Sequence, residues 1–152
     1  MRILIVNGPN IQLLGRREPD IYGRTTLAEI EETLRKTAAD LGITVDFLQS
    51  NHEGEILDKI ASIPEPPYDG IVINPAALTH TSVALHDALR AVGIPAVEVH
   101  ISNIYSREEF RRKSITASAC LGVISGLGSD GYEWALRALA RHIERNTKDE
   151  RL

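Results

Sequence analysis

Residues 3–7 (ILIVN), followed at once by Gly8-Pro9-Asn10, form the stretch that decides the fold of this chain. A short continuous apolar run that ends in turn-forming residues is typical of a strand buried on both faces of a parallel sheet. A second run of the same kind, residues 70–74 (GIVIN), ends at Pro75. These two runs predict the central strands of an α/β protein.

The remaining apolar stretches extend this pattern along the whole chain. Residues 44–48, 96–99 and 122–125 predict further strands, and amphipathic stretches predict helices at 27–41, 53–63, 82–92 and 132–145. Thr26 and Glu29 form a capping box before the first of these helices, and a basic segment at 107–113 predicts one more. Alternation of this kind favours a flavodoxin-like, doubly wound parallel sheet of order 2-1-3-4-5 with helices on both faces. We expect one domain over residues 1–146 and a charged, frayed tail over 147–152.

Composition excludes several classes of protein. The chain has 152 residues, of which 43% are hydrophobic and 25% charged, as in ordinary globular domains. A net charge of −4 argues against nucleic acid as the main partner, and no apolar run reaches the roughly 20 residues that span a bilayer. Cys120 is the single cysteine, so we expect no disulfide framework and a cytoplasmic location. No cluster of three ligands is spaced for zinc, so we expect no metal site.

Polar residues gather where the predicted strands end, which is where ligands bind in sheets of this type. They are Asn10, Arg16, Arg17 and Tyr22 after the first strand, Asn74 and His80 after the third, and Glu98, His100 and Ser102 at the fourth. Amides, hydroxyls and imidazoles suit a polyhydroxylated acid better than a phosphate or a flat aromatic cofactor. We therefore expect a small-molecule site without a cofactor.

Two features of this edge indicate acid–base chemistry. Glu98 and His100 are two residues apart on a strand and share a side, so the carboxylate favours the protonated imidazole of a general acid. The alternative is that the pair only ties a strand end to a loop. Tyr22 lies in a long loop over residues 8–25. A phenol, with an ordinary pKa of about 10, becomes a base near neutrality only beside a cation such as Arg16 or Arg17; otherwise it is a surface residue.

Four blocks of the sequence resemble the type II 3-dehydroquinate dehydratases. They are NGPNIQLLGRREPDIYG at 7–23, NPAALTHTSVALHDAL at 74–89, VEVHISNIYSREEFRRKS at 97–114 and GVISGLGSDGYEWAL at 122–136. The resemblance implies dehydration of 3-dehydroquinate to 3-dehydroshikimate by anti elimination through an enolate, in the shikimate pathway or in quinate catabolism. It also implies trimers joined into dodecamers and no cofactor.

The resemblance also implies a role for each site residue. Tyr22 matches the base, and Arg17 matches the arginine that activates it. His100 matches the general acid, and Glu98 matches the residue that orients His100. Asn10 matches the residue that holds a water on the enolate oxygen. The other matches are Asn74, His80 and Arg111 for the ring hydroxyls, Ile101 and Ser102 for the substrate carboxylate, and Asp87 for an acidic residue that reaches a neighbouring subunit's site.

The chain departs from the family pattern at two places. The family usually has a glycine within the stretch Pro75-Ala76-Ala77, and often Leu-Asn in place of Ile11-Gln12.

Unrelated type I enzymes for this reaction use a Schiff-base lysine. The lysines of this chain are predicted in helices or the tail rather than in an apolar strand-end pocket: Lys36, Lys59, Lys113 and Lys148.

Three other interpretations are weaker. Gly126, Gly128 and Gly131 spell GxGxxG, but they follow the last strand, so we expect a tight turn and not a nucleotide site. A phosphoacceptor or flavin module of the same fold requires acids or a hydroxyl-rich loop after the first strand, where this chain has NGPN. A non-catalytic binding protein gives no reason to keep Tyr22, Arg17 and His100 together.

Overall fold

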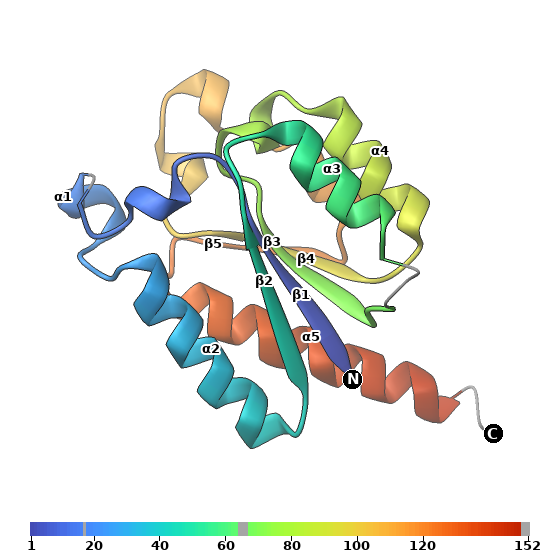
Figure 1. Ribbon diagram of the computed structural model, residues 1–152. Helices are drawn as coiled ribbons and strands as arrows, with labels where there is room; N and C mark the ends of the chain where they lie inside the picture. Colours follow the sequence, from blue (N-terminus) through green and yellow to red (C-terminus); the bar gives the residue numbers. More distant parts are fainter. Residues whose placement is uncertain (17, 64–66, 150–152) are drawn as a thin grey trace.

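The computed structural model describes residues 1–16, 18–63 and 67–149, and in them five parallel strands form one sheet of order β2-β1-β3-β4-β5 (Figure 1). This confirms the predicted fold class and strand order. The strands, each within one residue of its predicted bounds, are β1 (Arg2–Asn7), β2 (Thr44–Gln49), β3 (Gly70–Asn74), β4 (Ala96–His100) and β5 (Gly122–Ser125).

The register of the central strands brings their carboxyl ends level. Asn7 on β1 lies opposite Asn74 on β3, and His100 on β4 lies opposite Ser125 on β5. Beyond these pairs the backbones stay close, since the Gly8 nitrogen donates to the Asn74 carbonyl over 2.8 Å. A Cβ atom on Gly8 would sit 2.4 Å from the Pro75 carbonyl oxygen, so only glycine fits there.

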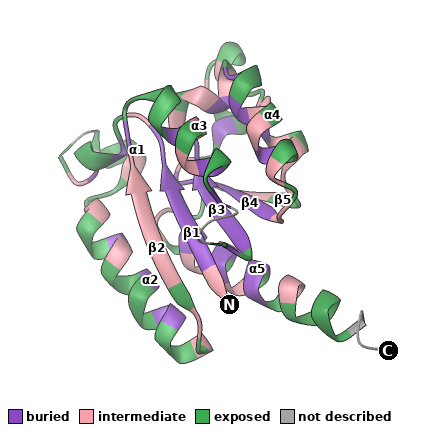
Figure 2. Cartoon of the chain, turned by 45° about the vertical axis from the view of Figure 1, so that its right-hand side comes forward, coloured by how far each residue is buried: buried purple, intermediate pink, exposed green. Residues whose placement is uncertain are grey.

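Two helices cover each face of the sheet (Figure 1). Helices α2 (Leu27–Leu41) and α5 (Asp130–Asp149) lie on one face, and α3 (Glu53–Ala61) and α4 (Val83–Val92) lie on the other. Figure 2 shows that β1, β3 and β4 are buried between these layers, whereas the edge strand β2 is half-buried. Alternate residues of β1 enter opposite cores, with Ile3 and Ile5 facing α2 and α5 and Leu4 and Val6 facing α3 and α4.

Helix α2 begins and ends as the sequence predicts. The Thr26 hydroxyl accepts from the Glu29 backbone nitrogen over 3.3 Å, and the Glu29 carboxylate accepts from the Thr26 nitrogen over 2.8 Å. The helix stops at Gly42, whose φ of 65° is left-handed. This capping box is therefore confirmed.

Three predicted elements differ from the structure. Helix α3 ends at Ala61, two residues before its predicted end. The helix expected at 107–113 is absent, and that stretch contains only a 3₁₀ turn, Glu109–Arg111. The stretch has no buried face to stabilise a longer helix, as the 70% exposure of Phe110 shows. Helix α5 begins two residues before its predicted start and runs to Asp149, with residues 150–152 outside the described part.

The division into a domain over 1–146 and a frayed tail stays a prediction. No described helix is long and apolar enough to span a membrane.

Candidate active site

A cavity of about 330 Å³ opens beyond the carboxyl ends of β1, β3 and β4. It lies at the edge where strand order reverses between β1 and β3, the usual ligand position in such sheets. Eight of the residues predicted for the site line it: Asn10, Tyr22, Asn74, His80, His100, Ile101, Ser102 and Arg111. Residues from four separate stretches of sequence therefore meet in one place.

Tyr22 reaches the cavity from the short helix α1 (Pro19–Tyr22) within the long loop after β1. Nη2 of Arg107 donates a hydrogen bond to the Tyr22 hydroxyl oxygen over 2.9 Å, and Nη1 of Arg107 lies 3.4 Å from the Ser102 hydroxyl. The sequence analysis gives Arg107 no role at the site, so this contact is one that sequence reasoning missed. The sequence signal that could have identified Arg107 is its position, seven residues after His100 in the loop that follows β4. Arg17, predicted to activate Tyr22, lies outside the described residues.

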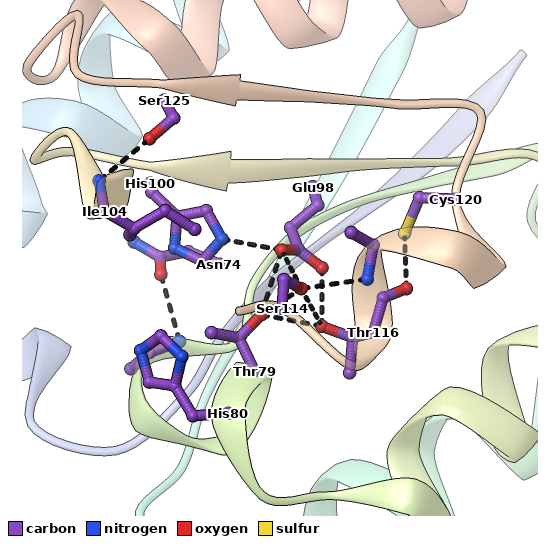
Figure 3. A network of polar contacts seen from close by, with 12 residues as sticks. Asn74, Thr79, His80, Glu98, His100, Ile104, Ser114, Thr116, Cys120 and Ser125 are labelled. Atoms are coloured by element: carbon purple, nitrogen blue, oxygen red, sulfur yellow. Dashed lines mark hydrogen bonds and ion pairs between the residues drawn. The ribbon is translucent and has the colours of Figure 1, made fainter. Parts of the chain in front are cut away.

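His100 and Glu98 form the buried acidic side of the site (Figure 3). Nε2 of His100 lies 2.6 Å from Oε1 of Glu98, which leaves Nδ1 as the ring nitrogen available for a ligand. Burial by itself raises the pKa of the Glu98 carboxyl, but hydrogen bonds from His100, Thr116 and Ser114 outweigh burial and hold the pKa below its ordinary value. These hydrogen bonds therefore favour the ionised carboxylate of Glu98 next to the His100 imidazole.

A second buried network fixes Asn74, which lies at the floor of the cavity. The fully buried Tyr132 of α5 donates to Oδ1 of Asn7 over 2.6 Å and accepts from Nδ2 of Asn74 over 2.8 Å. Oδ1 of Asn74 accepts from the Ala76 backbone nitrogen over 3.1 Å. Ala76 has a left-handed φ of 52°, at the stretch where the related family usually has glycine.

Asn10 lies near the start of the long loop in a left-handed conformation with φ of 69°, which asparagine tolerates better than most residues. Its backbone nitrogen donates to Oδ1 of Asn51 over 2.9 Å, and the Gln49 amide donates to Oε1 of Gln12 over 2.9 Å. The departure at Gln12 is thus accommodated by a hydrogen bond to β2. The start of the loop is therefore held both by the end of β2 and by the turn that follows β2.

The loops after β3 and β4 are joined beside the cavity. Nδ1 of His80 lies 2.8 Å from the Lys113 carbonyl, and the Ile115 nitrogen donates to the Thr79 carbonyl over 2.7 Å. Arg111 lines the cavity from the same stretch. These contacts place the residues expected to bind ring hydroxyls within one connected wall.

Other sequence-predicted features lie away from the cavity. Asp87 is on the exposed side of α4, where its carboxylate contacts Nδ1 of His86 over 2.9 Å. Gly126 and Gly128 have φ of 90° and 62°, which fits the predicted tight turn before α5. Within the described residues, no group of three His, Cys, Asp or Glu side chains is placed to hold a metal ion.

The fold and the site together define a class: a flavodoxin-like α/β protein with an acid–base site at the switch point of its sheet. Residues 1–140 match the family model described as class II dehydroquinase. A 3-dehydroquinate dehydratase from Endomicrobium trichonymphae is 56% identical over 138 residues, covering 91% of this chain and 96% of that protein. One from Gloeobacter violaceus is 52% identical over 150 residues, covering 99% of this chain and 93% of that protein.

A solved structure is also similar over nearly the full chain. The type II dehydroquinase of Butyrivibrio crossotus has a TM-score of 0.90 and 46% identity, covering 91% of this chain and 97% of that one. This chain belongs to the class II dehydroquinase family.

Proposed function

We propose that this chain dehydrates 3-dehydroquinate to 3-dehydroshikimate by anti elimination through an enolate, with Tyr22 as base and His100 as acid. One observation carries the assignment of roles. The phenol of Tyr22 and the imidazole of His100 line the same cavity. The phenol accepts a hydrogen bond from the Arg107 guanidinium, and the imidazole contacts the Glu98 carboxylate. A cation stabilises a phenolate base, and a carboxylate stabilises an imidazolium acid.

In the first step, the Tyr22 phenolate takes the proton from the carbon beside the ketone, and the C–H electron pair forms the enolate. Asn10 holds a water on the enolate oxygen. Arg107, and Arg17 by the family resemblance, favour the phenolate. Positioned donors of this kind contribute roughly 2.7–4 kcal/mol each to transition-state stabilisation.

In the second step, His100 gives its proton to the hydroxyl on the next carbon. The enolate electrons re-form the ketone and a conjugated C=C bond, and the hydroxyl leaves as water. The imidazole then regains a proton from solvent, and Tyr22 releases the one it took. Glu98 holds the imidazole in place throughout. Asn74, His80 and Arg111 bind the ring hydroxyls, and Ile101 and Ser102 bind the substrate carboxylate.

The described residues favour this route over an imine. The lysines of this chain lie outside the cavity lining: Lys36, Lys59, Lys113 and Lys148. An imine mechanism needs a lysine amine against the substrate ketone. The residues that do line the cavity suit proton transfer.

The assay follows the ultraviolet absorbance of the conjugated product after addition of 3-dehydroquinate. We expect turnover by the native chain, none by Tyr22→Phe, and no inactivation by borohydride in the presence of substrate. Tyr105→Phe, an exposed tyrosine outside the cavity lining, is the matched control and should retain activity. Absence of turnover at micromolar native protein, or covalent trapping of substrate on a lysine, would refute the proposal.

We also propose that the chain assembles as trimers joined into dodecamers in the cytoplasm, and that Asp87 reaches the site of a neighbouring subunit. The exposure of Asp87 on α4 is compatible with that role. Sedimentation velocity of the native chain tests the assembly. A species no larger than a monomer at working concentration would contradict it.

A further inference from the structure

Three hydroxyl groups surround the carboxylate of Glu98, and the family resemblance assigns none of them a role (Figure 3). Oε1 of Glu98 accepts from the hydroxyls of Thr79 at 2.9 Å and Ser114 at 2.7 Å, and Oε2 accepts from the hydroxyl of Thr116 at 2.5 Å. We call Thr79, Ser114 and Thr116 the hydroxyl cage. With His100, four donors converge on one carboxyl group that is itself fully buried.

The cage is assembled from two loops that are distant in sequence. Thr79 belongs to the turn after β3, whereas Ser114 and Thr116 follow the loop after β4. The hydroxyl oxygens of Thr79 and Ser114 are 2.7 Å apart, and those of Thr79 and Thr116 are 2.8 Å apart. The hydrogen bond from the Ile115 nitrogen to the Thr79 carbonyl locks the two loops together. Two of the three, Thr79 and Thr116, are fully buried, so water does not replace their hydroxyls.

The chemistry of the cage favours one protonation state. Each hydroxyl has one proton, which it donates either to Glu98 or to a neighbouring hydroxyl. An ionised carboxylate only accepts, whereas a protonated carboxyl adds a further donor to a cluster already rich in donors. Buried charges persist only when such hydrogen bonds replace water. Besides His100, the Cys120 thiol is a titratable group close to Glu98, and burial and the charge of Glu98 keep it protonated.

We propose that Thr79, Ser114 and Thr116 are positioning residues that hold Glu98 as a carboxylate in one orientation, so that His100 keeps the proton it transfers. The inference rests on the proposed function, because it assigns to the cage the maintenance of the general acid. The three cage residues are not among those that line the cavity. The cage acts through Glu98 and then His100.

Substitutions of Thr116 give the sharpest test, because valine and serine distinguish the effect of the hydroxyl group from the effect of the side-chain shape. Thr116→Val keeps the volume and removes the donor to Oε2, whereas Thr116→Ser keeps the donor. Loss of a hydrogen bond to a charged group should move the acid limb of the kcat–pH profile upward by about one pH unit. The direction follows because a carboxylate with fewer donors takes up a proton at higher pH. We expect kcat to fall by up to about tenfold on the acid limb and to change little near neutrality, with KM nearly unchanged, and Thr116→Ser to restore the native profile.

The same comparison at Thr79, Thr79→Val against Thr79→Ser, covers the case in which Thr116→Val does not fold. Thr33→Val, on the exposed side of α2, is the matched control and should leave the profile unchanged. Titration of the His100 ring by NMR gives a readout that does not depend on turnover. We expect its titration to shift in the valine variants and to match the native chain in the serine variants.

The outcomes separate this inference from the proposed function. If the native chain does not convert 3-dehydroquinate, the proposed function fails, whatever the variants do. If the native chain is active and folded valine variants show the native pH profile and the native His100 titration, the cage has no positioning role. An equal loss of kcat at every pH, with no shift of the acid limb, likewise overturns it.

Discussion

The guanidinium of Arg107 donates a hydrogen bond to the hydroxyl of Tyr22 across 2.9 Å, although the two residues are 85 positions apart in the chain. Arg107 also lies over the ring, with its guanidinium carbon 5.4 Å from the ring centre. The cation is therefore fixed relative to the phenol from the loop after β4, independently of the loop that carries Tyr22. This arrangement makes Arg107 a second candidate, beside Arg17, for favouring the phenolate.

Arg107→Ala should lower kcat roughly 100-fold, because the phenolate loses a cation that stabilises it. Steady-state kinetics with 3-dehydroquinate measure the effect. Arg141→Ala, at an exposed position on α5, is the matched control and should retain native kinetics. Native kcat in a folded Arg107→Ala variant would show that Tyr22 does not depend on this contact.

Tyr132→Phe should raise KM and lower stability by about 1–3 kcal/mol, since Asn7 and Asn74 each lose a buried hydrogen-bond partner. Burial raises the pKa of Tyr132, which keeps the native hydroxyl protonated and able to donate to Asn7. Urea unfolding and kinetics provide the two measurements. Tyr105→Phe, whose side chain is exposed, serves as control. An unchanged KM would mean that Asn74 needs no such support.

Ala76→Gly should stabilise the fold by up to about 1 kcal/mol. Alanine in the left-handed region costs about 1–2 kcal/mol, and the greater freedom of glycine in the unfolded chain offsets part of the gain. Ala77→Gly, a neighbour without positive φ, should be neutral or destabilising. Chemical denaturation of both variants decides the matter, and a loss of stability at position 76 would argue against strain there.

Glu98 should contribute stability that disappears in acid. Its pKa in the folded chain is below the ordinary carboxyl value, so the contribution is complete above that value and is lost as pH falls through the folded pKa. We expect the difference in unfolding free energy between the native chain and Glu98→Gln to shrink from about pH 6 to about pH 3. Glu144→Gln, exposed on α5, should show no such trend. A difference that stays constant with pH would contradict the prediction.

Cys120 should resist alkylation in the folded chain. Burial, with a smaller contribution from the negative charge of Glu98, raises the pKa of this thiol to about 12, and the thiol rather than the reactive thiolate dominates at pH 8. Mass spectrometry after iodoacetamide treatment should find little modification in the native chain and complete modification in urea. Rapid labelling of the folded chain would indicate an accessible thiolate.

The sequence by itself determined the strands, their order and the edge of the sheet at which the predicted site residues gather. The apolar runs around Ile5 and Val72 have only one stable location, between two layers of helices, and the residues that end those strands must then share one edge. Glu98 and His100 were paired from their spacing alone, because alternate residues of a strand face the same side. Local chemistry also fixed the start of α2 at Thr26.

Only the tertiary structure decided which distant side chains touch. The contact of Arg107 with Tyr22, the hydroxyl cage on Glu98 and the support of Asn74 by Tyr132 all join residues from separate loops or helices. The stretch at 107–113 was predicted helical from its charges, yet it follows the rim of the cavity as a 3₁₀ turn. Such contacts depend on the path of loops without periodicity, which sequence patterns do not encode. They form because buried polar groups must find partners once the sheet and its helices have packed.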